Sequence, residues 1–298
     1  MLKRIGLFLL VNLLVVVTIS FILNIFQVGN YLTASGINYQ SLLVFCLVWG
    51  MVGSFISLQL SRFMAKKLMG VRVIDSSQSR SDVEVKLVSM VHQIARKAGL
   101  TTMPEVGIFE SSELNAFATG PSKNRSLVAV SSGLLNTMTP SQVEGVLAHE
   151  VAHIANGDMV TMTLLQGIMN AFVMFLARVL AQVVDGALNR NSDNRHPGIA
   201  YFAMVWVFEI ILMIFASIVV AAFSRHREYR ADAGGAKLSS KASMIGALEA
   251  LQKNLHREDE KVAPAIAAFR ISNKSKIGLL FSTHPPLEDR IRALVDGK

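Results

Sequence analysis

The stretch from Ile5 to Ser61, IGLFLLVNLLVVVTISFILNIFQVGNYLTASGINYQSLLVFCLVWGMVGSFISLQLS, contains no Asp, Glu, Lys or Arg. A helix needs about 20 mainly apolar residues to cross the hydrocarbon core of a bilayer. The stretch therefore predicts two membrane-spanning helices, at 5–27 and 40–60, joined by a polar turn over 29–39.

An alternative for the first apolar run is a secretory signal peptide that is cut near Ala34. The apolar core of such a peptide is about 7–15 residues long, and a second span does not normally follow it at once. The first run is longer than that, and a second run follows directly. We therefore interpret residues 1–61 as an N-terminal transmembrane hairpin.

The composition of the whole chain agrees with membrane spans. Hydrophobic residues make up 52%, charged residues 17%, and the mean hydropathy is +0.44. A soluble domain carries about 25% charged residues, so the apolar sequence here exceeds what a surface in water would hold. The single cysteine, Cys46, lies in an apolar run. We expect it to pack there, with no disulfide and no role as a metal ligand.

Two further apolar runs lie at 159–184 and 198–223, and each contains one charged residue, Arg178 or Glu209. A charge near the bilayer centre costs about 2.5–3.5 kcal/mol on insertion scales. Counted from the connecting loop, the two charges lie at similar depths on antiparallel helices, so we expect them to form an ion pair. The alternative is a buried helical hairpin of a soluble domain. We interpret 159–223 as a second transmembrane hairpin.

If the chain crosses four times, the basic flanks that acidic residues do not offset all lie on one side of the membrane. They are Lys3, Arg4, Arg62, Lys66, Lys67, Arg72, Arg225, Arg227 and Arg230. On the other side, Arg190 and Arg195 are offset by Asp185 and Asp193. Since positive charge marks the cytosolic side, both termini and the polar regions 62–158 and 224–298 are predicted to be cytosolic. Topology also accounts for the net charge of +8, so no nucleic-acid partner is needed.

The polar regions mix helical and strand patterns, which predicts an α+β domain. In the first polar region we predict a helix over 82–99 that ends at Gly99, strands at 105–109 and 126–130, and a helix from Pro140 to Asn156. In the second we predict helices over 240–298, interrupted near Gly278 and at Pro285–Pro286.

The last of these helices contains His149-Glu150-Val151-Ala152-His153. Histidines four apart lie on one face of a helix, so both imidazoles can reach one Zn²⁺ ion. Glu150 is turned about 100° away from His149 and suits a general base beside the metal. The alternative is a helix surface with scattered polar side chains.

A catalytic zinc site needs a third protein ligand. Glu228 and Asp232 lie one helical turn apart, so Glu228 could ligate the metal while Asp232 accepts the outer N–H of a ligating histidine. Spacing alone does not separate this arrangement from an exposed helix face, and His226 is a rival ligand. Two predicted crossings separate His153 from Glu228, so both would lie at the cytosolic face of the membrane.

These motifs resemble the HtpX family of heat-shock membrane proteases, which is related to the CAAX-prenyl endopeptidases. The resemblance is carried by HEVAHIANGD at 149–158, EYRAD at 228–232, NAFATG at 115–120 and THPP at 283–286. It implies a mainly α membrane protein with four transmembrane helices and a cytosolic α+β zincin-like protease domain. It also implies a zinc endopeptidase of the bacterial inner membrane, which degrades damaged membrane proteins and whose third zinc ligand is Glu228.

The resemblance further implies roles for residues outside the metal site. Asn115, Ala116 and Phe117 would lie along the cleft, where an extended polypeptide substrate adds as a strand. The alternative for this segment is an ordinary turn. His284 would donate a hydrogen bond to the developing oxyanion, or it is simply the surface residue of a turn that starts a helix. Arg290 belongs to the same tail motif, and its role stays open.

Two rival functions remain open from the sequence. One is a CAAX-type processing protease with narrow substrates. The other is a membrane adaptor with a structural zinc ion and no catalysis, although structural sites are usually closed by a fourth protein ligand.

Overall fold

The computed structural model describes residues 32–33, 36–75, 81–188, 198–261 and 276–297. The chain divides into two compact units. The first contains Met1–Ser57 and Met162–Val220, and the second contains Leu58–Thr161 and Ala221–Lys298.

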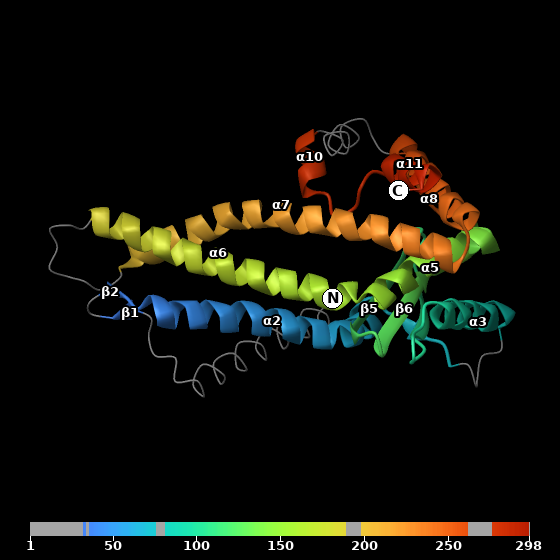
Figure 1. Ribbon diagram of the computed structural model, residues 1–298, viewed down its shortest axis with the longest axis horizontal. Coiled ribbons are helices and arrows are strands. Elements are labelled where there is room, and N and C mark those ends of the chain that lie inside the picture. Colours follow the sequence, from blue (N-terminus) through green and yellow to red (C-terminus); the bar gives the residue numbers. More distant parts are fainter. Residues whose placement is uncertain (1–31, 34–35, 76–80, 189–197, 262–275, 298) are drawn as a thin grey trace. The chain divides into compact units, whose positions relative to one another are not determined.

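Three long helices supply the described part of the first unit: α2 (Tyr39–Leu68), α6 (Asp158–Leu188) and α7 (Ile199–Leu238). Each is long and apolar enough to cross a membrane. Their apolar stretches run alongside one another (Figure 1), and a short pair of strands, β1 (Leu32–Thr33) and β2 (Gly36–Ile37), precedes α2. The predicted span at 5–27 lies outside the described residues, so four spans remain a prediction.

Small residues allow α2 and α6 to approach closely. A Cβ atom on Gly50 would lie 2.6 Å from the backbone oxygen of Gly167. Close backbone approach at small residues is a common way to pack helices in lipid. Cys46 is fully buried beside Leu42 and Ala171, as expected for a packing cysteine.

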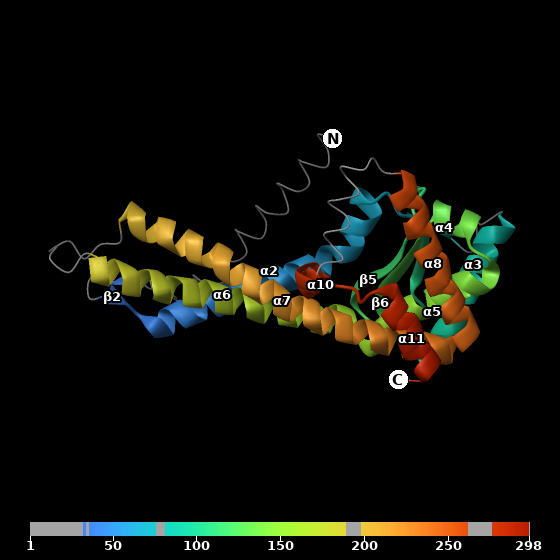
Figure 2. The same cartoon turned by 90° about the horizontal axis from the view of Figure 1, so that it is seen from above.

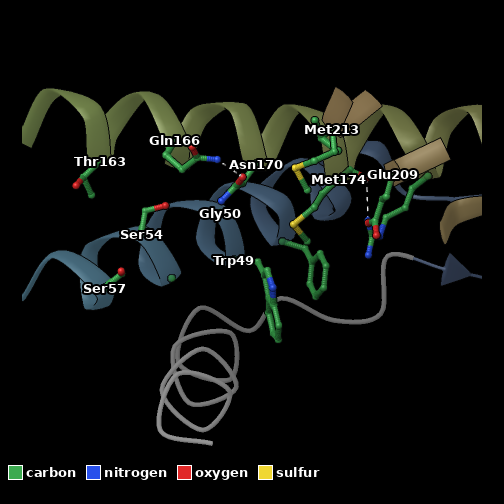
Figure 3. Close-up of a pocket in the computed structure, with 14 residues that line it drawn as sticks. Trp49, Gly50, Ser54, Ser57, Thr163, Gln166, Asn170, Met174, Glu209 and Met213 are labelled. Carbon is green, nitrogen blue, oxygen red and sulfur yellow. Dashed lines mark hydrogen bonds and ion pairs between the residues drawn. The ribbon is translucent and has the colours of Figure 1, made fainter. Parts of the chain in front are cut away.

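The predicted pairing of Arg178 with Glu209 is confirmed. Arg178 Nη1 donates to Glu209 Oε1 over 2.7 Å, and it also donates to the backbone oxygen of Met174. Both residues line a cavity of about 650 Å³ between α2, α6 and α7, and Figure 3 shows Glu209 at one end of it. The ion pair offsets the cost of holding two charges in an apolar helical unit.

A four-stranded mixed sheet forms one layer of the second unit. Its strands are β3 (Arg72–Val73), β4 (Glu105–Phe109), β5 (Ala116–Ser122) and β6 (Arg125–Ser131), in the order β3-β4-β6-β5. β4 and β6 are parallel, whereas β5 pairs antiparallel with β6. β5 is thus an edge strand among the described residues, which makes the alternative of an ordinary turn at 115–120 wrong.

Six helices accompany this sheet among the described residues of the unit. They are α3 (Asp82–Lys97), α4 (Ser132–Thr137), α5 (Pro140–Asn156), α8 (Lys241–Lys261), α10 (Lys276–Phe281) and α11 (Leu287–Asp296). α5 lies against β5 and β6 and contacts α8 on its other side (Figure 2). The main apolar core lies between α3, α5 and the sheet.

The predicted helices and strands of this unit are largely confirmed. α5 has the predicted bounds, β4 also does, and α11 begins directly after Pro286. Gly278 itself lies inside α10, while residues 262–275 before this helix lie outside the described residues, so the predicted interruption near Gly278 stays a prediction. Glycine costs only about 1 kcal/mol in a helix relative to alanine, so neighbouring residues can carry the helix through it.

Candidate metal centre and active site

Helix α5 positions the two histidines. Thr139 caps its first turn in a reciprocal capping box with Gln142, and Gly157 ends it in the left-handed conformation at φ 75°. The intervening apolar side chains, including Leu147 and Val151, are fully buried in the core. This burial fixes the rotation of the helix and turns His149 and His153 towards α7.

Two adjacent glycines let α7 approach α5. A Cβ atom on Gly235 would lie 3.1 Å from the backbone nitrogen of His149, and one on Gly234 would lie 3.0 Å from Ala152 Cβ. Each distance is tighter than nearly all ordinary Cβ contacts. The glycines therefore allow the approach that brings Asp232 and Glu228, about one and two turns earlier on α7, to the histidines.

The metal-binding atoms of His149, His153 and Glu228 converge. The two Nε2 atoms lie 3.1 Å apart, and Glu228 Oε1 lies 3.2 Å from His153 Nε2. One possible ligand atom from each of the three buried residues lies within 4.8 Å of the others. Glu228 Oε1 is buried and accepts no hydrogen bond from the described residues. Two imidazoles and a carboxylate are a preferred zinc donor set, so these residues fit a metal ion.

A carboxylate accepts a hydrogen bond from the Nδ1 atom of each imidazole. His149 Nδ1 donates to Asp232 Oδ1 over 2.9 Å, and His153 Nδ1 donates to Asp158 Oδ2 over 2.6 Å. A proton on Nδ1 leaves the lone pair on Nε2, where a metal would bind. The rival ligand His226 is exposed and lies outside this cluster.

Asp158 was missed by the sequence reasoning, although it stands in a quoted motif. It is the first residue of α6 and is 4% exposed. The left-handed turn at Gly157 carries the chain back, so that a residue five positions after His153 can meet its ring. The signal in the sequence is a carboxylate directly after a glycine that ends the histidine helix.

The charges around these side chains favour ionised carboxylates. Burial opposes a charged His149, but the hydrogen bonds to Asp232 and Glu228 outweigh it and raise the pKa of His149 to about 9. Burial likewise opposes ionisation of Glu228, but its close contacts with His149, His153 and His284 hold its pKa well below the usual value. Metal binding would therefore release protons from the histidines.

Two residues of the C-terminal segment complete the polar network. The guanidinium of Arg290 is buried and donates to both oxygens of Asp232, over 2.6 and 2.8 Å. His284 Nδ1 lies 2.8 Å from Glu228 Oε2, although the His284 side chain is 62% exposed. Arg290 and His284 therefore orient the carboxylates that face the two metal-binding histidines.

A cavity of about 200 Å³ opens beside this cluster. It is lined by Glu150, His149, Glu228, His284 and Arg290, and also by Asn115 and Ala116 at the start of β5. The family resemblance predicts that Phe117 lies along the cleft together with these two residues. Phe117 instead packs against Phe109 in a separate cluster, with ring centroids 5.6 Å apart, and it does not line the cavity. Alternate residues of a strand point to opposite faces of the sheet.

Comparisons with known proteins agree with the motifs. The model of peptidase family M48 matches residues 81–297. The protease HtpX homolog of Bacillus velezensis is 54% identical over 299 residues, which cover 99% of each chain. The protease HtpX of Cellvibrio japonicus is 51% identical over 294 residues, which cover 98% of each chain.

A solved structure shares the fold. The crystal structure of S. mikatae Ste24p superposes with a TM-score of 0.63 at 21% identity, over 99% of this chain and 64% of that chain. The long apolar helices agree with a multi-pass membrane protein. With the family match, the identities to HtpX proteases and the cluster of metal-binding side chains, the chain belongs to peptidase family M48 and is a membrane metalloendopeptidase.

Proposed function

We propose that the metal is Zn²⁺ and that His149, His153 and Glu228 hold it. The observation that carries this proposal is the convergence of two imidazole Nε2 atoms on a buried carboxylate, while each Nδ1 is occupied by an aspartate. Unpaired lone pairs that face one another in a buried site are costly unless a cation lies between them. The two histidines and the carboxylate match the set of catalytic zinc sites that keep one position open.

When bound, Zn²⁺ would supply a Lewis acid that polarises the scissile carbonyl and acidifies water. Glu150 lines the cavity next to the ligands and is not one of them, so we assign it the role of general base. It takes a proton from the attacking water and returns it to the leaving amine. Asp158 and Asp232 hold the imidazole rings, and we assign to His284 a hydrogen bond to the developing oxyanion.

The substrate is an extended polypeptide that pairs with the edge of β5, which no other described strand occupies. Asn115 and Ala116 lie where this edge meets the cavity, and their backbone groups would position the substrate. Phe117 would contribute through its backbone alone, because its side chain packs with Phe109.

We assign the enzyme to the bacterial inner membrane, with the metal centre at the cytosolic face and damaged membrane proteins as substrates. The basic flanks of the apolar helices and the HtpX relatives support this assignment. CAAX-type processing remains the alternative, with narrow substrates. A structural zinc ion in an adaptor fits less well, because three residues form the cluster in the described part of the chain.

A chelator tests the proposed reaction. Purified full-length protein in detergent should cleave casein, and 1,10-phenanthroline should reduce this cleavage to background, because the metal supplies the Lewis acid. Added Zn²⁺ should restore it, whereas an inhibitor of serine proteases should have no effect. Cleavage that persists once metal analysis finds no zinc would contradict the proposal.

Cysteine labelling tests the orientation. With Cys46 replaced by serine, a cysteine placed at Asn191, between α6 and α7 in the sequence, should react with a membrane-impermeant maleimide added to intact cells. A cysteine in place of Lys253 on α8, which is exposed, should react only after the membrane is disrupted. The reverse pattern would show that the metal centre faces the other side.

A further inference from the structure

The C-terminal segment that carries His284 is held against α7 at two points. Arg225, Glu228 and Asp232 stand at positions i, i+3 and i+7 of α7, so their side chains share one face of that helix. Arg225 binds the segment before His284, and Arg290 binds Asp232 after it. His284 lies between these two points, with its Nδ1 atom 2.8 Å from Glu228 Oε2.

The first of the two points is the guanidinium of Arg225. Its Nη1 donates to a cluster of three backbone oxygens, those of Leu279, Leu280 and Ser282, over 3.0, 3.1 and 2.8 Å. Leu279 and Leu280 belong to the last turn of α10, where carbonyl oxygens have no partner within the helix. The helix dipole also favours a cation at this end. Arg225 therefore fixes the end of α10 beside α7 (Figure 1) and the chain that leaves it.

Two nearby arginines of α7 make no such contact in the described part of the chain. Arg227 Nη2 lies 3.9 Å from Glu228 Oε1, and Arg230 Nη2 lies 3.9 Å from Asp158 Oδ1. Both distances are too long for a hydrogen bond. A role as basic flank of a membrane span accounts for all three arginines, but the three hydrogen bonds of Arg225 need a further explanation.

A short and restricted link joins this point to His284. Ser282, whose backbone oxygen accepts from Arg225, donates through Oγ to the backbone oxygen of His284 over 2.5 Å. His284 precedes Pro285, and a residue before a proline is largely confined to extended conformations. The backbone from Ser282 to His284 therefore has little freedom while Arg225 holds Ser282.

Packing does little to hold the His284 ring. Its side chain is 62% exposed, whereas the carboxylate that it contacts, on Glu228, is 1% exposed. An exposed side chain keeps most of its rotamer freedom unless other contacts restrict it. The position of the ring over Glu228 therefore depends on how the backbone is anchored, and Arg225 is the anchor closer to it in sequence.

We propose that Arg225 is a positioning residue for peptide cleavage, which holds residues 279–282 so that His284 stays at the reaction centre. This role rests on the proposed function, because it takes His284 as the donor to the developing oxyanion. It goes beyond that function by making a residue outside the cavity necessary for full turnover. A hydrogen-bond donor that is fixed in advance stabilises the transition state without a cost of reorganisation.

Arg225→Met tests this role, because methionine keeps an unbranched stem and removes the donors. In purified full-length protein loaded with zinc, kcat for a quenched fluorescent peptide should fall about 10–100-fold, as expected for a misplaced catalytic group. His284→Ala should cost more, about 10²–10³-fold, the usual loss for an oxyanion donor. KM should stay unchanged, because the oxyanion exists only in the transition state. Zinc affinity should also stay unchanged.

Two further variants serve as conservative replacement and matched control. Arg225→Lys keeps a charged donor at this point and should recover part of the lost kcat. Arg292→Met makes the same chemical change as Arg225→Met at a side chain of α11 that is 72% exposed. It should leave kcat, KM and zinc affinity at the values of the wild type.

A double-mutant cycle separates positioning from general damage to the fold. Once His284 is gone, Arg225 has no ring left to place. The double variant Arg225→Met/His284→Ala should therefore have the same kcat as His284→Ala alone. A role of Arg225 that is independent of His284 would instead multiply the two losses.

Several outcomes would overturn the role of Arg225. They are unchanged kcat in Arg225→Met, losses that multiply in the double variant, and a fall in zinc affinity that accompanies the fall in kcat. Full turnover by His284→Ala would also overturn it, together with the assignment of His284. All of these leave zinc-dependent cleavage by the wild type intact, whereas absence of that cleavage would overturn the proposed function itself.

Discussion

Glu150→Gln is expected to lower kcat for peptide cleavage by about 10²–10⁴-fold, the usual contribution of a general base, while zinc remains bound. The amide keeps the size of the carboxylate but cannot take a proton from water. Glu150 is absent from the cluster of convergent ligand atoms, so its replacement should leave the metal donors in place. Zinc content by atomic absorption and cleavage of a fluorescent peptide, measured on one sample, give both readouts.

Glu144→Gln provides the matched control for this variant. Glu144 lies on the same helix, undergoes the same chemical change and does not line the cavity. Its zinc content and turnover should equal those of the wild type. Full turnover by metal-loaded Glu150→Gln would rule out Glu150 as the base. Loss of zinc from this variant would instead place Glu150 among the ligands.

Glu228→Ala is expected to abolish both stable zinc binding and proteolysis. Glu228 is 1% exposed, and its carboxylate faces both Nε2 atoms, so its removal takes away a ligand and the negative charge that balances the cation. Zinc affinity, measured by competition with a fluorescent chelator, should fall further than for any variant of an outer hydrogen-bond partner. Circular dichroism checks that the helices remain folded.

Asp158→Asn is the graded comparison within the same experiment. Asp158 contacts His153 Nδ1 and is not among the convergent ligand atoms, so its loss should weaken zinc binding by only about 10–100-fold. Glu249→Gln, an exposed acidic position on α8, should have no effect. Unchanged zinc affinity in Glu228→Ala would exclude Glu228 as the third ligand.

The local elements of the second unit could be predicted because their signals lie close together in the sequence. Thr139, Pro140 and Gln142 mark the start of α5, Gly157 marks its end, and both bounds agree with the structure. The ion pair of Arg178 and Glu209 was also predictable, because a charge in an apolar helix needs a partner at similar depth.

Contacts between distant segments could not be predicted in the same way. The close approach of α5 and α7 depends on Gly234 and Gly235, which in the sequence are two ordinary glycines in a polar helix. The partner of Arg290 is Asp232, 58 positions earlier in the chain, and no local pattern links the two. The pattern at 115–120 likewise did not show that Phe117 turns away from the cavity, because this depends on the register of β5 with β6.

The two halves of the metal cluster flank the helical hairpin of α6 and α7, because His149 and His153 precede it and Glu228 follows its apolar part. During synthesis, the third ligand emerges only after the whole hairpin has been made. The three proposed ligands therefore cannot meet until both helices have been synthesised, so a chain that is cut short before Glu228 cannot complete the cluster.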